Sequence, residues 1–63
     1  MIRERYFLID PNGTYYAEID NRVSTTESIE QAFAFVAFDA AVKKGLILNS
    51  LGYQVEHVAS IQF

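Results

Sequence analysis

The sequence predicts an α+β fold, in which a small antiparallel sheet of three to four strands carries one helix on one face. Three observations support this. Two runs of aromatic and β-branched residues flank a tight-turn sequence, a central segment ends in a helix-stop signal, and the last residues alternate apolar with polar. With 63 residues, 51% hydrophobic and 21% charged, the chain is expected to fold as a single domain over residues 1–63.

The first element is a β-hairpin. Residues 2–9 and 14–20 are strand-like, and between them lies Asp10-Pro11-Asn12-Gly13. Pro11 has the φ of the second turn position, and Gly13 supplies the positive φ of a bulge. With Asp10 opposite Thr14, the expected pairs run from Ile9 with Tyr15 to Arg5 with Ile19.

This register makes both faces of the hairpin apolar. We assign one face to the core, namely Phe7, Ile9, Tyr15, Ala17 and Ile19. The opposite face is expected to stay exposed, because one helix can cover only one side of a sheet. It carries Tyr6, Leu8 and Tyr16, with Glu4, Glu18 and Asp20 beside them.

Two interpretations of the central segment stay open after a polar, turn-like stretch at 21–28. The capping box Ser24-Thr25-Thr26-Glu27 favours one helix from about 25 to 44. That helix would be apolar on two sides, so it would have to be sandwiched between other elements. The alternative is a short strand over 33–36 followed by a helix over 37–50. Phe38, Ala41, Val42, Gly45, Leu46 and Leu48 would then face inward, Ile47 and Leu51 outward, and Gly52 would end the helix in a left-handed conformation.

The final element is a strand over residues 53–63. Tyr53, Val55, His57, Ala59, Ile61 and Phe63 share one face, and only Val58 interrupts the alternation. The expected organisation is therefore β-β-(β)-α-β.

Composition excludes several classes of function. Without cysteine there is no disulfide and no Cys-based zinc site, and one histidine cannot form a His-cluster metal site. Five Lys and Arg against eight Asp and Glu, a net charge of −3, argue against direct nucleic-acid binding. No run reaches the length of a membrane span, and the charged start is unlike a signal peptide, so we expect a cytoplasmic protein.

No catalytic constellation is visible, and we expect neither an enzyme nor a cofactor. His57 has no nucleophile or orienting carboxylate on its own face of the strand, so it is interpreted as structural. The acids Glu18, Asp20, Glu27, Glu30 and Asp39 lack calcium-loop spacing and are interpreted as solvated charge, with no metal site.

One further pattern runs through the second half of the chain, namely Ile29-Glu30-x-Ala32-x-x-Phe35, then Ala41, then Leu51-Gly52-Tyr53-x-Val55-x-x-Val58. In this pattern the chain resembles small accessory proteins of bacteriophages and other mobile elements. The resemblance implies a strand, a short helix and a closing strand, which favours the second interpretation of the central segment. The segment from Ala37-Phe38-Asp39-x-Ala41-Val42 onward is also similar in layout to a phage inhibitor of host RNA polymerase, with about one extra helical turn before Gly52. The resemblance implies a protein that binds and disables one host machine, such as RNA polymerase, a restriction enzyme or a CRISPR complex. It carries over no functional residue.

The functional hypothesis is a small acidic, non-enzymatic inhibitor that binds a basic surface of a host protein in a bacterial cytoplasm. Its binding surface would be Tyr6, Leu8, Tyr16, Glu18 and Asp20. The alternative is a homodimeric self-association module. The core of a 63-residue chain gives only marginal stability, and burial of apolar surface against a second copy would increase it. Ile47 and Leu51 are the dimer candidates.

Overall fold

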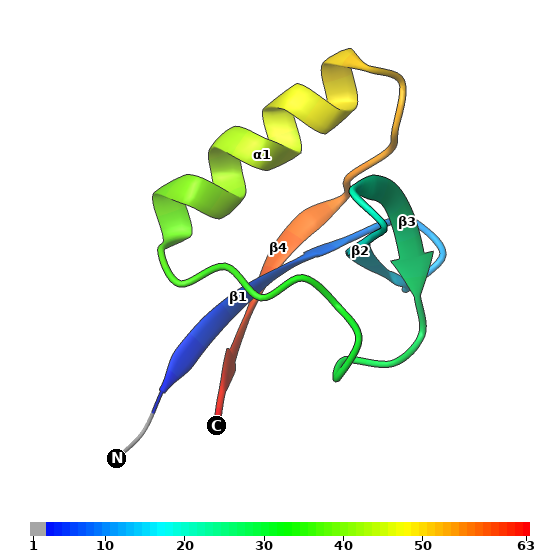
Figure 1. The fold of residues 1–63 in the computed structure, drawn as a ribbon. Coiled ribbons are helices and arrows are strands. Elements are labelled where there is room, and N and C mark those ends of the chain that lie inside the picture. The colour runs from blue at the N-terminus through cyan, green and yellow to red at the C-terminus, as the bar shows by residue number, and fades with distance from the viewer. Residues whose placement is uncertain (1–2) are drawn as a thin grey trace.

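The computed structural model describes residues 3–63, and over these residues the fold is α+β (Figure 1). Its elements are β1 (Glu4–Ile9), β2 (Tyr15–Ile19), β3 (Arg22–Thr26), α1 (Phe38–Ser50) and β4 (His57–Gln62). The strands form an antiparallel sheet of order β3-β2-β1-β4, so the first strand is central and the last strand is at an edge. The expected fold class is confirmed. No helix in the described part of the chain is long and apolar enough to cross a membrane.

The turn between β1 and β2 forms as its sequence predicts. The Asp10 N–H donates to the Thr14 carbonyl and the Gly13 N–H to the Asp10 carbonyl, each at 3.0 Å, and Gly13 has a φ of 82°. The Asp10 carboxylate accepts the Asn12 N–H at 2.9 Å, the Thr14 N–H at 3.0 Å and the Thr14 hydroxyl. These donors, the Thr14 hydroxyl first, lower the pKa of Asp10 because they favour its charged form.

Beyond the turn, β1 and β2 diverge, which the expected register did not include. Of the expected pairs only Ile9 with Tyr15 is present in the sheet. Residues 33–35 lie between the two strands. The Phe33 N–H donates to the Tyr16 carbonyl at 2.9 Å, and Phe35 and Tyr6 exchange N–H···O bonds of 2.8 and 2.9 Å. The pairs expected from Leu8 with Tyr16 to Arg5 with Ile19 are therefore wrong.

The turn-like interpretation of residues 21–28 holds for Asn21 and for residues 27–28 but is wrong for Arg22–Thr26, which form strand β3. Asp20 and Asn21 have φ values of 53° and 62°, and these left-handed residues form a two-residue hairpin turn. Ser24 and Thr25 pair with Ala17 and Tyr16 along β2. The first three residues of the capping box, Ser24 to Thr26, therefore lie in a strand, and a single helix over 25–44 is excluded.

The alternative with a short extended segment followed by a helix is confirmed in its main features. Phe35 forms an isolated bridge to Tyr6, and α1 spans Phe38–Ser50. The helix ends where Gly52 takes a φ of 97°. There the Gly52 N–H donates to the Asn49 carbonyl at 3.1 Å and the Tyr53 N–H to the Leu48 carbonyl at 3.0 Å. These two bonds form a Schellman motif, which satisfies the carbonyls of the last turn.

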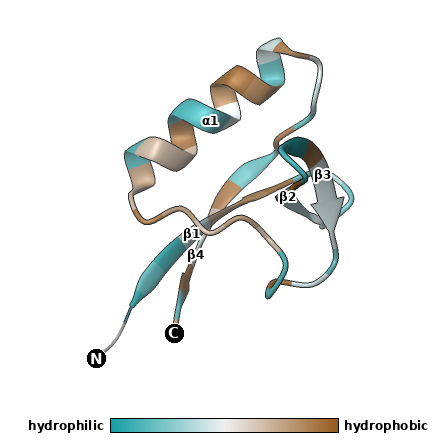
Figure 2. Ribbon diagram, in the orientation of Figure 1, coloured by the Kyte–Doolittle hydropathy of each residue, from teal (hydrophilic) through white to brown (hydrophobic). Residues whose placement is uncertain are grey.

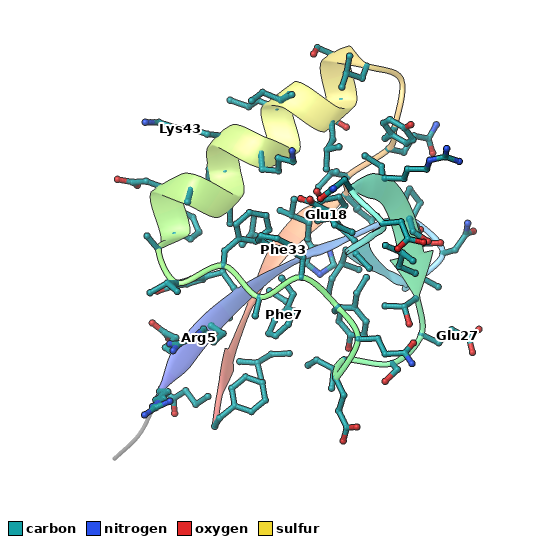
Figure 3. The ribbon with its side chains drawn as sticks, in the orientation of Figure 1. Arg5, Phe7, Glu18, Glu27, Phe33 and Lys43 are labelled. Atoms are coloured by element: carbon teal, nitrogen blue, oxygen red, sulfur yellow. The ribbon has the colours of Figure 1, made fainter. Side chains whose placement is uncertain are left out.

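The helix covers the face of the sheet that was expected to be open. The buried cluster consists of Leu8, Tyr16, Phe35, Ala41 and Leu48, with Tyr6, Val23, Val55 and Val58 packed against it. Side chains alternate along a strand, so Phe7 and Tyr15 lie on the face away from α1. In Figure 3 Phe33 lies between α1 and the sheet, and Phe7 lies on the other side of β1.

The face away from α1 is also buried at its centre. Phe7 is 1% exposed and Ala17 is fully buried, and Phe7 makes edge-to-face contacts with Tyr15 and Phe63 at ring distances of 6.0 and 6.2 Å. Figure 2 shows hydrophobic residues along the central part of β1 and also along α1. The helix itself buries only Ala41, Gly45 and Leu48, whereas Phe38 and Leu46, both expected to face inward, are more than half exposed.

Candidate binding cleft

An apolar cleft lies between the β1–β2 turn, β3 and the end of α1. Its volume is about 310 Å³, which is at the lower end of the range for sites that hold small molecules or single anchoring side chains. The turn contributes one wall, β3 a second, and the segment that links α1 to β4 a third. The lining residues are Leu8, Ile9, Asp10, Pro11, Asn12, Tyr16, Val23, Ser24, Thr25, Leu48, Gly52, Tyr53, Gln54 and Val55.

The floor of the cleft is part of the hydrophobic core. Leu8 and Leu48 are each 1% exposed, and Tyr16 is 5% exposed. Val23 and Val55 are half-buried and flank them. A packed floor of this kind is preformed, so a ligand would not have to order it.

The third wall is held in place by a side-chain bond from the helix. Asn49, in the last turn of α1, accepts the Val55 N–H on its Oδ1 at 2.9 Å. The Schellman motif directs the chain back toward the sheet, and the Glu56 N–H donates to the Ile9 carbonyl at 2.8 Å. Tyr53, which lies in this link, remains 48% exposed. Its ring is therefore the largest accessible apolar group of the cleft wall.

Tyr16 is a structural residue of the core. Its ring stacks on Phe35 at 6.1 Å, and the Lys44 Nζ lies 5.9 Å from its centroid. Its hydroxyl donates to the Glu18 carboxylate. Burial, and next the bond to Glu18, raise the pKa of Tyr16, so the hydroxyl stays protonated and cannot serve as a base near neutral pH.

The predicted aromatic and acidic surface is not formed. Leu8 and Tyr16 lie beneath α1, and Tyr6 makes an edge-to-face contact with Phe38 at 5.6 Å. Tyr6, Leu8 and Tyr16 were assigned to the wrong side because both faces of the hairpin are apolar. The rings of Tyr6 and Tyr16 can be buried because each hydroxyl keeps a hydrogen bond to an acid on its own strand. Glu18 and Asp20 are exposed, as expected.

Tyr6 shows the same arrangement as Tyr16. Its hydroxyl donates to Glu4 Oε1 at 2.6 Å, and the Ser60 hydroxyl of β4 donates to Glu4 Oε2 at 2.6 Å. The bond from Ser60, followed by that from Tyr6, lowers the pKa of Glu4. The bond to Glu4 raises the pKa of Tyr6. This network links β1 to β4 at the end of the sheet away from the cleft.

The two dimer candidates are on the surface of α1. Ile47 is 52% exposed and Leu51 66% exposed. Sequence reasoning missed the cleft residues Val23, Tyr53 and Gln54, because the cleft depends on β3, which was not predicted. The residue pair Asp20-Asn21 was the signal that could have found β3, since both types tolerate left-handed turn positions.

The one histidine lies at the start of β4, on the face away from α1. Its Nδ1 is 4.0 Å from Glu56 Oε2, and both side chains are more than half exposed. The expectation that no carboxylate lies beside His57 is corrected, because Glu56, which directly precedes β4, brings its carboxylate next to the imidazole. Within residues 3–63, no group of three or more His, Asp or Glu side chains is placed to hold a metal ion.

Comparison with known proteins adds no family assignment. No family model, curated protein or solved structure matches the chain.

Proposed function

We propose that this protein is a non-enzymatic binding protein whose cleft takes an apolar anchor side chain of a partner protein. The observation that carries the proposal is the packed apolar floor of Leu8, Tyr16 and Leu48 under an open volume of about 310 Å³. Protein interfaces concentrate their binding energy where a single aromatic or aliphatic side chain fills a preformed pocket.

Charge around the cleft favours a partner with basic residues beside the anchor. A second hollow, lined by Ile19, Asp20 and Arg22, shares Val23 and Ser24 with the cleft. In this hollow the exposed Asp20 is balanced by the exposed Arg22, and the acid Asp10 lines the cleft itself. The whole chain has eight acidic against five basic residues. Opposite charge at the rim of an interface accelerates association and disfavours acidic competitors.

The resemblance to phage accessory proteins supports a narrower form of the proposal. In that form the partner is a protein machine in the cytoplasm of a bacterial host, such as RNA polymerase, a restriction enzyme or a CRISPR complex, and occupation of its basic surface inhibits it. The small size and acidic balance of the chain support this role, because an acidic surface competes with nucleic acid for basic grooves.

The test compares two lysine substitutions of exposed apolar residues. Tyr53→Lys places a charge in the cleft wall, whereas Leu46→Lys places the same charge on α1, outside the residues that line the cleft. Each tagged variant is incubated with bacterial lysate, and captured proteins are quantified by mass spectrometry.

A partner that uses the cleft is retained by the wild type and by Leu46→Lys, and its capture falls by about tenfold or more with Tyr53→Lys. Equal capture by all three proteins would show that the cleft is not the binding site. Circular dichroism of each variant checks that the fold is unchanged.

Self-association is the second candidate function, and the exposure of Ile47 and Leu51 favours it. In this form the two side chains pack against those of a second copy, without an inhibitory role. Ile47→Lys would then reduce the sedimentation coefficient at high concentration. An unchanged coefficient would exclude this surface.

A further inference from the structure

Strand β4 is an unprotected sheet edge. It lies at the end of the strand order β3-β2-β1-β4, and its six residues His57–Gln62 include no Lys, Arg, Asp, Glu or Pro. The other edge strand, β3, begins with Arg22. Natural sheets guard free edges with charges, proline or bulges, because an unguarded edge pairs with another strand.

The hydrogen bonds to β1 identify the backbone groups that this edge leaves free. The Arg3 N–H donates to the Phe63 carbonyl at 3.1 Å and the Phe63 N–H to the Arg3 carbonyl at 2.8 Å, so this pair faces inward. Inward and outward groups alternate along an antiparallel strand. The N–H and C=O groups of Val58, Ser60 and Gln62 therefore point away from β1.

An apolar flank of α1 lies on the same side as this edge. Lys44 lies over the Tyr16 ring and marks the β2 side of the helix. Val42, two residues before Lys44, is about 160° around the helix from it and therefore lies on the β4 side of α1. Leu46 lies beside Val42 on this flank, farther from the sheet. Leu46 is 66% exposed, and Phe38, one turn before Val42, is 52% exposed.

We propose that β4 pairs antiparallel with β4 of a second copy of this chain, about a two-fold axis at Ser60. Val58 of one copy then lies opposite Gln62 of the other, and three hydrogen-bonded pairs form about six N–H···O bonds. The two sheets become one continuous sheet, and the flanks that carry Phe38 and Leu46 meet above it. This surface is separate from the cleft and from Ile47 and Leu51.

Charge at the ends of β4 favours a second copy of the chain as the partner, with the two β4 strands antiparallel. Glu56 precedes the strand, and Arg3 pairs with Phe63 just beyond its end. Antiparallel pairing about Ser60 places Glu56 of one copy just beyond Phe63 of the other, one strand away from Arg3, twice by symmetry. Parallel pairing would bring Glu56 toward Glu56, which is unfavourable.

The size of the contact indicates a reversible dimer. Six strand residues extend for about 20 Å, and the helix adds a layer of about 10 Å. The contact is then on the order of 400–500 Å² per chain, near the lower limit for specific interfaces, so we expect a dissociation constant in the micromolar range.

The first test uses the unmodified chain. Sedimentation velocity should change from the 7.2 kDa monomer to twice that mass between about 1 μM and about 500 μM. Amide exchange at Val58, Ser60 and Gln62 should slow by about tenfold or more over the same range, because these amides face solvent in the monomer. A monomer at every concentration would overturn the proposal, and so would a dimer without slower exchange at these three amides.

Matched variants then distinguish the surfaces. Ser60→Pro removes the central outward N–H, and Ser60→Ala controls for the hydroxyl that binds Glu4. Leu46→Lys and Ser60→Pro should each weaken the dimer by about tenfold or more, while Ser60→Ala, Ile47→Lys and Tyr53→Lys should not. Loss of dimer with Ile47→Lys alone would overturn the proposal in favour of the other face of α1. The two proposals fail in different experiments. If the cleft does not bind a partner, Tyr53→Lys leaves capture from lysate unchanged. If β4 does not form the dimer, Ser60→Pro leaves sedimentation unchanged.

Discussion

Replacement of Gly45 by alanine should stabilise the protein, although Gly45 is buried in the middle of α1. A β-carbon built at this position would lie 3.6 Å from Leu8 Cδ2 and 3.6 Å from Val55 Cγ1, which is ordinary van der Waals contact. Glycine in a helix interior costs about 1 kcal/mol relative to alanine. One additional buried methyl group contributes up to about 0.8 kcal/mol.

The expected gain in the free energy of unfolding is therefore about 1–2 kcal/mol. For a domain of this size, each kcal/mol raises Tm by about 4–8 °C. Thermal and urea unfolding followed by circular dichroism, at one fixed protein concentration, would measure both quantities. Fixed concentration matters because any dimer also stabilises the fold.

Gly52→Ala is the matched control, because it adds the same methyl group with the opposite expected sign. Gly52 has a φ of 97° with open space around its Cα, so the cost is backbone strain of about 1–2 kcal/mol and not a steric contact. A decrease in stability for Gly45→Ala would refute the reasoning, since it would mean that α1 lies closer to β1 than the structure has it.

Three further substitutions test other parts of the structure. Leu48→Ala should lower the free energy of unfolding by about 2–5 kcal/mol in urea titrations, because it leaves a cavity between α1 and the sheet; a loss below about 1 kcal/mol would contradict the assigned core. Asn49→Ala should cost about 1 kcal/mol, because the Val55 N–H loses its acceptor, and faster exchange of that amide is the check. Asp10→Ala should destabilise the turn at neutral pH. The pKa of Asp10 is lowered in the fold, so its contribution is present above the ordinary value of 3.8 and is lost as the pH falls through the folded pKa. The difference from wild type in urea melts should shrink below about pH 3.8, and a constant difference would argue against the ionised carboxylate as the acceptor.

Local signals in the sequence predicted much of the fold. The turn at Asp10 and Gly13 and the helix end at Gly52 follow from residues a few positions apart, and both are present. Apolar periodicity left open whether one helix spans 25–44 or a helix starts near residue 37, and only the resemblance to phage accessory proteins favoured the second. Turns and helix ends depend on the steric preferences and backbone hydrogen bonds of residues that are close in the sequence, so they can be predicted from residue types alone.

The candidate site could not be predicted in the same way. Leu8 and Phe7 are equally apolar neighbours on opposite faces, so alternation alone does not say which of them α1 covers. The outcome depends on long-range packing, in which the small residues Ala41 and Gly45 let the helix approach Leu8. One signal in the sequence indicated that Tyr16 can be buried. Glu18 follows two positions later on the same face of the strand, so its carboxylate can accept the hydrogen bond of the Tyr16 hydroxyl.

The pairing of β4 with β1 affects how fast the chain can fold. Glu4 pairs with Gln62 and Ile9 with His57, so the partners are separated by 58 and 48 positions in the sequence. Folds dominated by distant pairings assemble slowly, because a large loop must close before its contacts form. During synthesis β1 cannot pair with β4 until residues 57–62 have left the ribosome, and until then this apolar strand has an unpaired edge that is open to aggregation.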